Sequence, residues 1–130
     1  MHDLAPQGRV VTFDIVPWQE YPGGVLCDAD FEDGRLVQQI DDLSTPGGLE
    51  RHRELLSQAD LVFVDAAKDG HQEQRFLDNF AQITFAAPPI MVFDDIRLWN
   101  MLKIWRGIRR PKLDLTSFGH WSGTGLIDWR

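Results

Sequence analysis

Residues 61–95 read LVFVDAAKDGHQEQRFLDNFAQITFAAPPIMVFDD, and this stretch decides the fold. Two apolar runs, 61–64 and 90–93, are each followed directly by aspartate: Asp65 after the first, Asp94 and Asp95 after the second. Short, continuous apolar runs are typical of strands buried on both faces, as in parallel sheets. Residues 72–84, between the runs, have the length and spacing of a helix. The stretch therefore predicts a right-handed β–α–β unit with two parallel strands.

The aspartates at the two strand ends should lie together. The carboxyl ends of neighbouring parallel strands share one edge of the sheet, where open α/β sheets bind ligands. Carboxylates gathered there repel one another unless a proton or a cation relieves them, and hard oxygen ligands favour Mg²⁺, Ca²⁺ or Mn²⁺. Asp65, Asp94 and Asp95 are thus candidate metal ligands. Two alternatives stay open: the acids cap the following helices and remain solvated, or Lys68 neutralises them without a metal.

Strands and helices alternate on both sides of this unit. The further expected elements are strands at 9–14 and 36–40, a loop at 25–35, helices at 45–59 and 98–109, and hairpin strands at 113–118 and 125–129. Thr45 fits a helix N-cap, with Pro46 at the first helical position. We therefore predict one domain over residues 1–130 of class α/β, with a Rossmann-like, doubly wound, mostly parallel sheet and a C-terminal antiparallel hairpin.

Acidic residues also end the two earlier predicted strands. Asp14, after the first, could accept hydrogen bonds from the hydroxyls of an adenosine ribose, or could be a solvated residue that starts a turn. Asp41 and Asp42, after the next, could accept from an adenine amino group or cap the following helix. His71 and His120 are candidate general bases, although a single histidine is more often a surface or packing residue.

Composition and charge narrow the functional class. The chain of 130 residues has 43% hydrophobic residues and a net charge of −7, and its longest basic run is Arg109-Arg110. Nucleic acid is therefore not an expected partner, apart from a local basic patch around those arginines. Cys27 is the only cysteine, which fits a reducing compartment. No apolar run approaches the roughly 20 residues of a membrane span, so we expect a cytoplasmic protein without a membrane partner.

The segment LVFVDAAKDG, residues 61–70, resembles the fourth-strand motif of class I S-adenosylmethionine-dependent methyltransferases, in particular the Asp-Ala-x-Lys pattern of the O-methyltransferases. FDDIRLW, residues 93–99, is similar to the fifth-strand Asp-Asn-x-x-Trp signature of that branch, with one extra residue before the tryptophan. The strand ending at Asp14, the residues 39–42 and the terminal hairpin also resemble parts of that fold. The resemblance covers residue 10 to the C-terminus.

This resemblance implies site residues and cofactors. It places S-adenosylmethionine binding on Asp14, Asp41, Asp42 and Asp65, and catalysis on Lys68 and Asp65. In the cation-dependent members, the metal ligands match Asp65, Asp94 and Asp95, although the family has asparagine where this chain has Asp95. There Mg²⁺ or another divalent cation would hold two vicinal oxygens of the acceptor. Lys68 would be an acid/base group or a structural ion-pair partner.

The glycine-rich part of the family pattern does not occur before Asp14. The family's first strand and its Gly-x-Gly loop should precede Asp14 by about 20 residues, whereas 13 residues precede it here. We therefore expect a methyltransferase-like domain that is N-terminally incomplete. In the family this first strand lies between strands two and four. Without it, those strands would pair directly, leave exposed edges, or borrow a strand from another chain, as in a homo-oligomer.

Three functions are compatible with these observations. The first is methyl transfer from S-adenosylmethionine to an oxygen, or less favourably a nitrogen, of a small-molecule acceptor. The second is a non-catalytic remnant of the methyltransferase fold that acts in oligomerisation or partner binding. The third is metal-dependent phosphoryl transfer at Asp65, Asp94 and Asp95, for which the sequence has no phosphate-binding loop.

Overall fold

The computed structural model describes residues 7–130, which form two compact units. One unit ends at Leu43 and the other spans Ser44–Arg130.

The first unit is built on two parallel strands, β1 (Val10–Asp14) and β2 (Leu36–Ile40). Their register pairs Val10 with Leu36 and Asp14 with Ile40, so both strands end at the same edge. The connection between them holds two short 3₁₀ helices, η1 (Trp18–Glu20) and η2 (Asp28–Phe31), whose Trp18 and Phe31 rings stack with centroids 5.2 Å apart. The prediction of a loop with little regular structure at 25–35 is confirmed.

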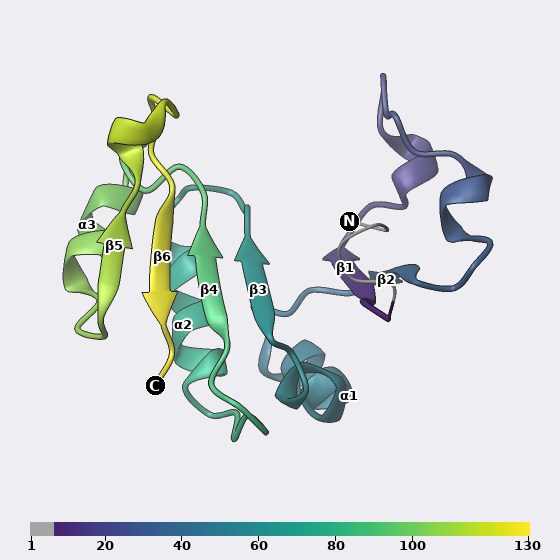
Figure 1. Cartoon of the computed structure of the whole chain (residues 1–130), viewed down its shortest axis with the longest axis horizontal. Coiled ribbons are helices and arrows are strands. Elements are labelled where there is room, and N and C mark those ends of the chain that lie inside the picture. Colours follow the sequence, from purple (N-terminus) through teal and green to yellow (C-terminus); the bar gives the residue numbers. More distant parts are fainter. Residues whose placement is uncertain (1–6) are drawn as a thin grey trace. The chain divides into compact units, whose positions relative to one another are not determined.

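The second unit contains a mixed four-stranded sheet, shown in Figure 1. Its strands are β3 (Leu61–Val64), β4 (Ile90–Phe93), β5 (Lys112–Asp114) and β6 (Gly125–Asp128), in the order β3-β4-β6-β5. β3 and β4 are parallel, while β6 is antiparallel to both β4 and β5. The parallel β–α–β unit and the closing antiparallel hairpin are therefore confirmed.

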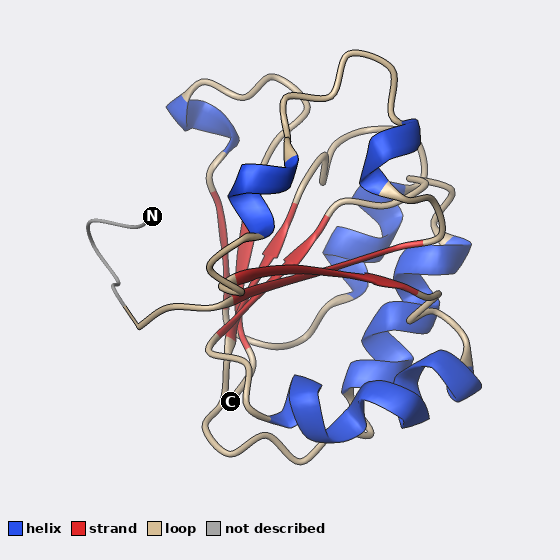
Figure 2. Ribbon diagram, turned by 90° about the vertical axis from the view of Figure 1, so that its right-hand side faces the viewer, coloured by secondary structure: helices blue, strands red, loops and turns tan. Residues whose placement is uncertain are grey.

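Helices cover one face of this sheet. The unit has α1 (Pro46–Ser57), α2 (His71–Phe80), α3 (Met101–Gly107) and the short 3₁₀ helix η3 (Thr116–Phe118). α2 and α3 lie behind the strands in Figure 1, and the turned view in Figure 2 shows helices on that side of the sheet. Met91, Phe93 and Ile127 point into this layer and are almost completely buried. The period-two alternation of the strands thus places the hydrophobic core between sheet and helices.

Side chains on the opposite face of the same strands are largely exposed. Leu61, Phe63, Ile90 and Leu113 each expose more than a third of their surface. A doubly wound sheet carries helices on both faces. The described fold is therefore α/β with a mixed sheet, and the doubly wound arrangement stays a prediction.

Three predicted boundaries are wrong. The helix predicted at 72–84 ends at Phe80, and the helix predicted at 98–109 begins only at Met101. Trp99, just before it, has a φ of 40°, which is incompatible with a right-handed helix. The strand predicted at 113–118 ends at Asp114, because the Asp114 carboxylate accepts a hydrogen bond from Thr116 N and turns the chain into η3. By contrast, Thr45 caps α1 as expected, since its hydroxyl accepts from Gly48 N at 3.0 Å.

In the part of the chain that the structure describes, no helix is long and apolar enough to span a membrane.

Candidate functional site

The loop after β3 is folded around a buried lysine. Lys68 is only 5% exposed and has a φ of 62°, a left-handed conformation that costs a non-glycine residue free energy. Its ammonium group forms an ion pair with Asp65, which begins the loop. The same ammonium nitrogen lies 3.5 Å from Asp95 Oδ2, at the end of the neighbouring strand β4. Lys68 therefore joins the carboxyl ends of the two parallel strands.

A second buried charged residue holds this loop in place. Glu73, in the first turn of α2, is fully buried, and its two carboxylate oxygens accept from Lys68 N at 2.7 Å and from Gly70 N at 2.9 Å. These hydrogen bonds satisfy backbone donors that would otherwise be buried without partners. Gly70 closes the turn with a φ of 79°, and a Cβ atom at that position would lie 2.8 Å from Asn100 Cβ. The loop is thus pre-organised by the hydrogen bonds from its N–H groups to the Glu73 carboxylate.

The turn before α2 adds a further fixed carboxylate. Asp69 accepts from the backbone N–H groups of His71 and Gln72. These bonds, the one from Gln72 first, hold the pKa of Asp69 below its usual value. The Asn100 side chain donates a hydrogen bond to the backbone carbonyl oxygen of Asp69 at 2.9 Å. This bond connects the turn before α2 with the loop that precedes α3.

Asp94, next to Asp95, faces a histidine rather than the lysine. His120 Nδ1 lies 3.3 Å from Asp94 Oδ1, and Thr124 Oγ1 lies 3.3 Å from the same ring nitrogen. The buried Ser122 hydroxyl is 3.4 Å from His120 Nε2. One ligand atom each from Asp94, Asp95 and His120 lies within 4.8 Å of the others. Two loops that are separate in sequence therefore meet here.

Backbone hydrogen bonds hold these two loops together. Ile96 N donates to Gly123 O at 3.0 Å, and Arg97 N donates to Ser122 O at 2.9 Å.

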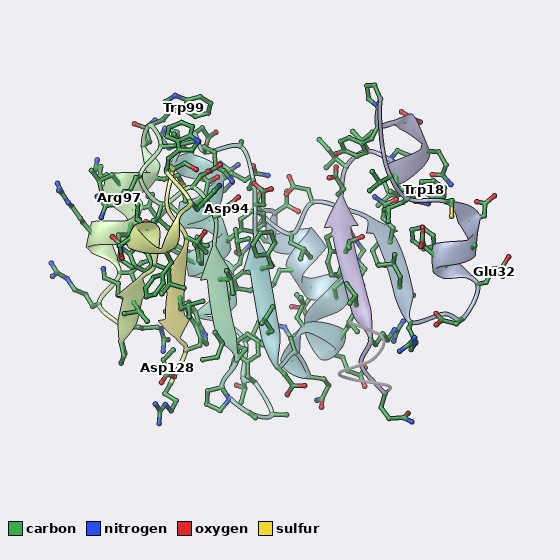
Figure 3. All side chains as sticks on the ribbon, turned by 45° about the horizontal axis from the view of Figure 1, so that its top comes forward. Trp18, Glu32, Asp94, Arg97, Trp99 and Asp128 are labelled. Atoms are coloured by element: carbon green, nitrogen blue, oxygen red, sulfur yellow. The ribbon has the colours of Figure 1, made fainter. Side chains whose placement is uncertain are left out.

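The Arg97 guanidinium in turn donates to Asp114 and to Thr116 Oγ1. The Thr116 hydroxyl and N–H, with Arg97, hold the pKa of Asp114 below its usual value. Figure 3 shows Asp94, Arg97 and Trp99 at one end of the sheet and Asp128 at the other.

Backbone strain gathers at this end of the sheet. Among residues 7–130, the non-glycine residues with positive φ are Lys68, Asp95 and Trp99, in the loops after β3 and β4. Such conformations persist only where the surroundings impose them, and they cluster at functional sites. The carboxyl ends of β3 and β4 are therefore the strongest candidate site among the described residues.

The other predicted site residues lie elsewhere. His71 lines a groove of about 460 Å³ between the starts of α2 and α3, together with Asp69, Asn100 and Ile104. Asp65, Asp94 and Asp95 do not line that groove. Of the two candidate histidines, only His120 thus joins the cluster of strand-end carboxylates.

Asp14, Asp41 and Asp42 belong to the first unit. Asp14 Oδ1 accepts from Val16 N, and Oδ2 accepts from the exposed Tyr21 hydroxyl at 2.7 Å. The Asp14 carboxylate raises the pKa of Tyr21, mainly through this hydrogen bond. Asp41 N donates to Asp14 O, and Asp42 N donates to Asp41 Oδ1, so the three acids stand in one connected turn region. Asp14 therefore already accepts from a hydroxyl at the carboxyl end of its strand.

The predicted metal ligands Asp65, Asp94 and Asp95 differ from the group whose ligand atoms converge among the described residues. The Lys68 ammonium already neutralises Asp65, and the group of side chains with converging ligand atoms contains His120 in place of Asp65. The three-carboxylate set stays a prediction. The alternative in which Lys68 neutralises the acids describes the contacts of Asp65 and Asp95 better.

Two residues of the site were missed in the sequence. Glu73 looked like an ordinary helical acid, but it stands three residues after Gly70 at the first turn of α2, the spacing at which a carboxylate reaches back to a loop backbone. Ser122 carries no such signal, although it stands only two residues after His120 in the same loop.

Compared with models of known protein families, with curated proteins and with solved structures, the chain matches none.

Proposed function

We propose that this chain is a methyltransferase-like protein that transfers a methyl group from S-adenosylmethionine to an oxygen, or less favourably a nitrogen, of a small-molecule acceptor. The observation that carries the proposal is the buried Lys68, whose ammonium joins Asp65 and Asp95 at the carboxyl ends of two parallel strands. A buried, strained and charged residue at the ligand-binding edge of an α/β sheet is typical of an active site. The proposal includes a Rossmann-like, doubly wound sheet.

The first unit supplies the residues that would hold the cofactor. Asp14 accepts from a hydroxyl in the structure, which is the interaction that a ribose hydroxyl would make. Asp41 and Asp42 lie beside it at the end of β2 and would meet the adenine. The bound cofactor would supply a methyl group on a positively charged sulfur.

In this mechanism the chain positions the acceptor and manages its proton. The Lys68 ammonium would donate a hydrogen bond to the acceptor oxygen and stabilise the negative charge that develops as its hydroxyl loses a proton. Asp65, which is 56% exposed at its side chain, would receive that proton. These two residues would thus hold the acceptor oxygen deprotonated and facing the methyl group that the bound cofactor would supply. Holding the reacting atoms in line accounts for most of the rate increase.

Cofactor binding tests the first half of this proposal. We expect S-adenosylmethionine and S-adenosylhomocysteine to bind the chain in isothermal titration calorimetry, and Asp14→Ala to weaken binding by about tenfold or more, since a hydrogen bond to a charged group is lost. Asp28→Ala, which removes an exposed acid of the same unit, is the control and should bind normally. Equal affinities for wild type and Asp14→Ala would contradict the assignment.

Turnover tests the second half. Formation of S-adenosylhomocysteine would be followed with a panel of phenols and vicinal diols as acceptors. Lys68→Met should remove most of the activity while cofactor affinity stays near that of wild type, because Lys68 acts on the acceptor. Full activity of Lys68→Met would exclude the role given to the ammonium group.

A second candidate function is assembly without catalysis. The exposed apolar face of the sheet, with Leu61 60% and Phe63 57% exposed, favours burial against a second copy of this chain. Light scattering after gel filtration would then show a homo-oligomer, and Phe63→Lys would convert it to a monomer. Val25→Lys, at an exposed apolar residue of the first unit, is the matched control and should leave the oligomer intact. A monomeric wild type would rule out this candidate.

A further inference from the structure

The groove between the starts of α2 and α3 has the size of a small-molecule site. Its volume is about 460 Å³, and sites for small molecules have volumes of about 300 to 1,000 Å³. None of the strand-end carboxylates Asp65, Asp94 and Asp95 lines it. The groove is therefore a cavity apart from the candidate active site.

Three basic side chains from two helices line this groove. His71 and Arg75 are four residues apart on α2 and so lie on one face of that helix, and Lys103 comes from α3. Other basic side chains of this unit form ion pairs, as Arg97 does with Asp114. Among the described residues, Arg75 and Lys103 form none. The groove therefore presents cations that no carboxylate of the chain contacts.

The one carboxylate of the lining is bonded to backbone. Asp69 Oδ1 accepts from His71 N at 2.7 Å and from Gln72 N at 2.9 Å. The bonds from Gln72 and His71 are the main cause of the lowered pKa of Asp69, and the charges of His71 and Arg75 contribute least to it. Within α3 there is no acidic residue. The lining thus carries a net positive charge in a chain whose net charge is −7.

The least exposed residues of the lining form an apolar floor. Gly70 and Ile104 are half-buried, whereas the other lining residues are exposed. A Cβ atom at Gly70 would lie 2.8 Å from Asn100 Cβ and 3.7 Å from Ile104 Cγ1, so the turn before α2 packs closely against α3. This floor suits the carbon skeleton of a ligand, while the basic side chains suit an anionic group.

We infer that this groove binds a phosphate monoester of a small organic molecule. The Arg75 guanidinium would hold two phosphate oxygens in parallel, and the Lys103 ammonium would act as a point charge beside them. A phosphate monoester carries a charge of about −1.5 to −2 at neutral pH, which matches several cations better than a single carboxylate does. A bare phosphate would leave the floor at Gly70 and Ile104 uncovered.

Calorimetric titration of the full chain at fixed ionic strength tests this inference with three probes: phenyl phosphate, inorganic phosphate and phenol. No cofactor or acceptor is present, so the result does not depend on the proposed function. We expect one saturable site for phenyl phosphate. Inorganic phosphate should bind about tenfold more weakly because it buries no apolar surface. Phenol, which lacks the charge, should show no measurable binding.

Two variants each remove one cation of the groove. Arg75→Ala and Lys103→Ala should weaken the binding of phenyl phosphate by about tenfold or more, because a hydrogen bond to a charged group is lost. Arg106→Ala is the matched control, since it removes the same charge from an exposed position of α3 that does not line the groove. Its affinity should stay within about twofold of wild type, because salt screens distant charges. Circular dichroism would check that all three variants fold.

Three results would each overturn the inference. The first is no saturable binding of phenyl phosphate by the wild type. The second is an equal loss of affinity in Arg106→Ala and Lys103→Ala, which would indicate a general attraction of the anion rather than a site. The third is binding of inorganic phosphate or of phenol as tight as that of phenyl phosphate, which would exclude a phosphate monoester as the preferred ligand.

Discussion

The loops that follow β1 and β3 begin alike and have different surroundings. Each comes directly after a parallel strand, and each has an aspartate at that point, Asp14 or Asp65. Asp14 bonds to a nearby backbone N–H and to an exposed tyrosine hydroxyl. Asp65, by contrast, pairs with a lysine that is itself buried and strained.

This difference shows what an aspartate at a strand end does and does not indicate. The pattern places the acid at the binding edge of a sheet in both cases. Whether the following loop becomes a rigid, partly buried site depends on residues further along, above all Glu73, which fixes the backbone of Lys68 and Gly70. The loop after β1 has no fully buried residue: all side chains from Ile15 to Arg35 are exposed or half-buried.

The largest expected effect comes from removing the carboxylate that supports the β3 loop. Glu73→Ala should lower the free energy of unfolding by about 3 kcal/mol, because two buried N–H groups lose their acceptor. Urea unfolding followed by tryptophan fluorescence would measure this. Glu54→Ala, at an exposed position of α1, is the control, and its free energy should change by no more than about 0.5 kcal/mol. Equal stabilities of the two variants would show that the β3 loop is no more constrained than the loop after β1.

A change of intermediate size in the free energy of unfolding is expected when one glycine of each loop is replaced by alanine. Gly70 and Gly34 both have positive φ, but an added Cβ would lie 2.8 Å from Asn100 Cβ at Gly70 and would meet open space at Gly34. Gly34→Ala should lower the free energy of unfolding by about 1 kcal/mol through backbone strain alone. Gly70→Ala adds the close contact to this strain and should lower the free energy of unfolding by about 2 to 3 kcal/mol. The same unfolding measurement checks both, and a Gly70→Ala cost no larger than that of Gly34→Ala would contradict the tight packing of the β3 loop.

The smallest effect is a pH-dependent one in the first unit. The bond from its hydroxyl to the Asp14 carboxylate raises the pKa of Tyr21, so the folded protein holds the phenol proton more tightly than the unfolded chain does. The resulting stabilisation is present below the ordinary tyrosine pKa of about 10 and is lost as the pH rises through the higher folded pKa.

Tyr21 is the only tyrosine of the chain, so an ultraviolet absorbance titration reports on it alone. Asp14→Asn should move the pKa of Tyr21 down towards its ordinary value, while Asp28→Asn should leave it in place. An unchanged Tyr21 titration in Asp14→Asn would show that the contact does not form in solution.

Much of the second unit could be predicted from local signals. The apolar runs of β3 and β4, Thr45 and Pro46 at the start of α1, and the glycine-rich turn before β6 each state a local preference that the fold follows. Helix ends were less predictable. The chain between β4 and α3 has helical periodicity, yet the contacts of that loop hold Asp95 and Trp99 at positive φ and delay the helix to Met101.

The candidate site was also only partly predictable from the sequence. That Asp65, Asp94 and Asp95 lie near one edge follows from the parallel pairing of β3 and β4, which the sequence predicts. No sequence spacing predicts that Lys68 is buried between Asp65 and Asp95. Nor does any spacing predict that His120, rather than Asp65, lies beside Asp94.

What the sequence alone determined is therefore the strands, their polarity and the acids at their ends, because hydrophobic period and turn residues act over a few neighbouring positions. What only the tertiary structure decided is which charged groups meet. Those contacts depend on the register of β4 with β6, which brings the loop containing His120 against the loop containing Asp94, and on the burial of Glu73 and Lys68. Contacts between residues far apart in the chain form only when the packed core holds their backbones in place, and no local pattern records them.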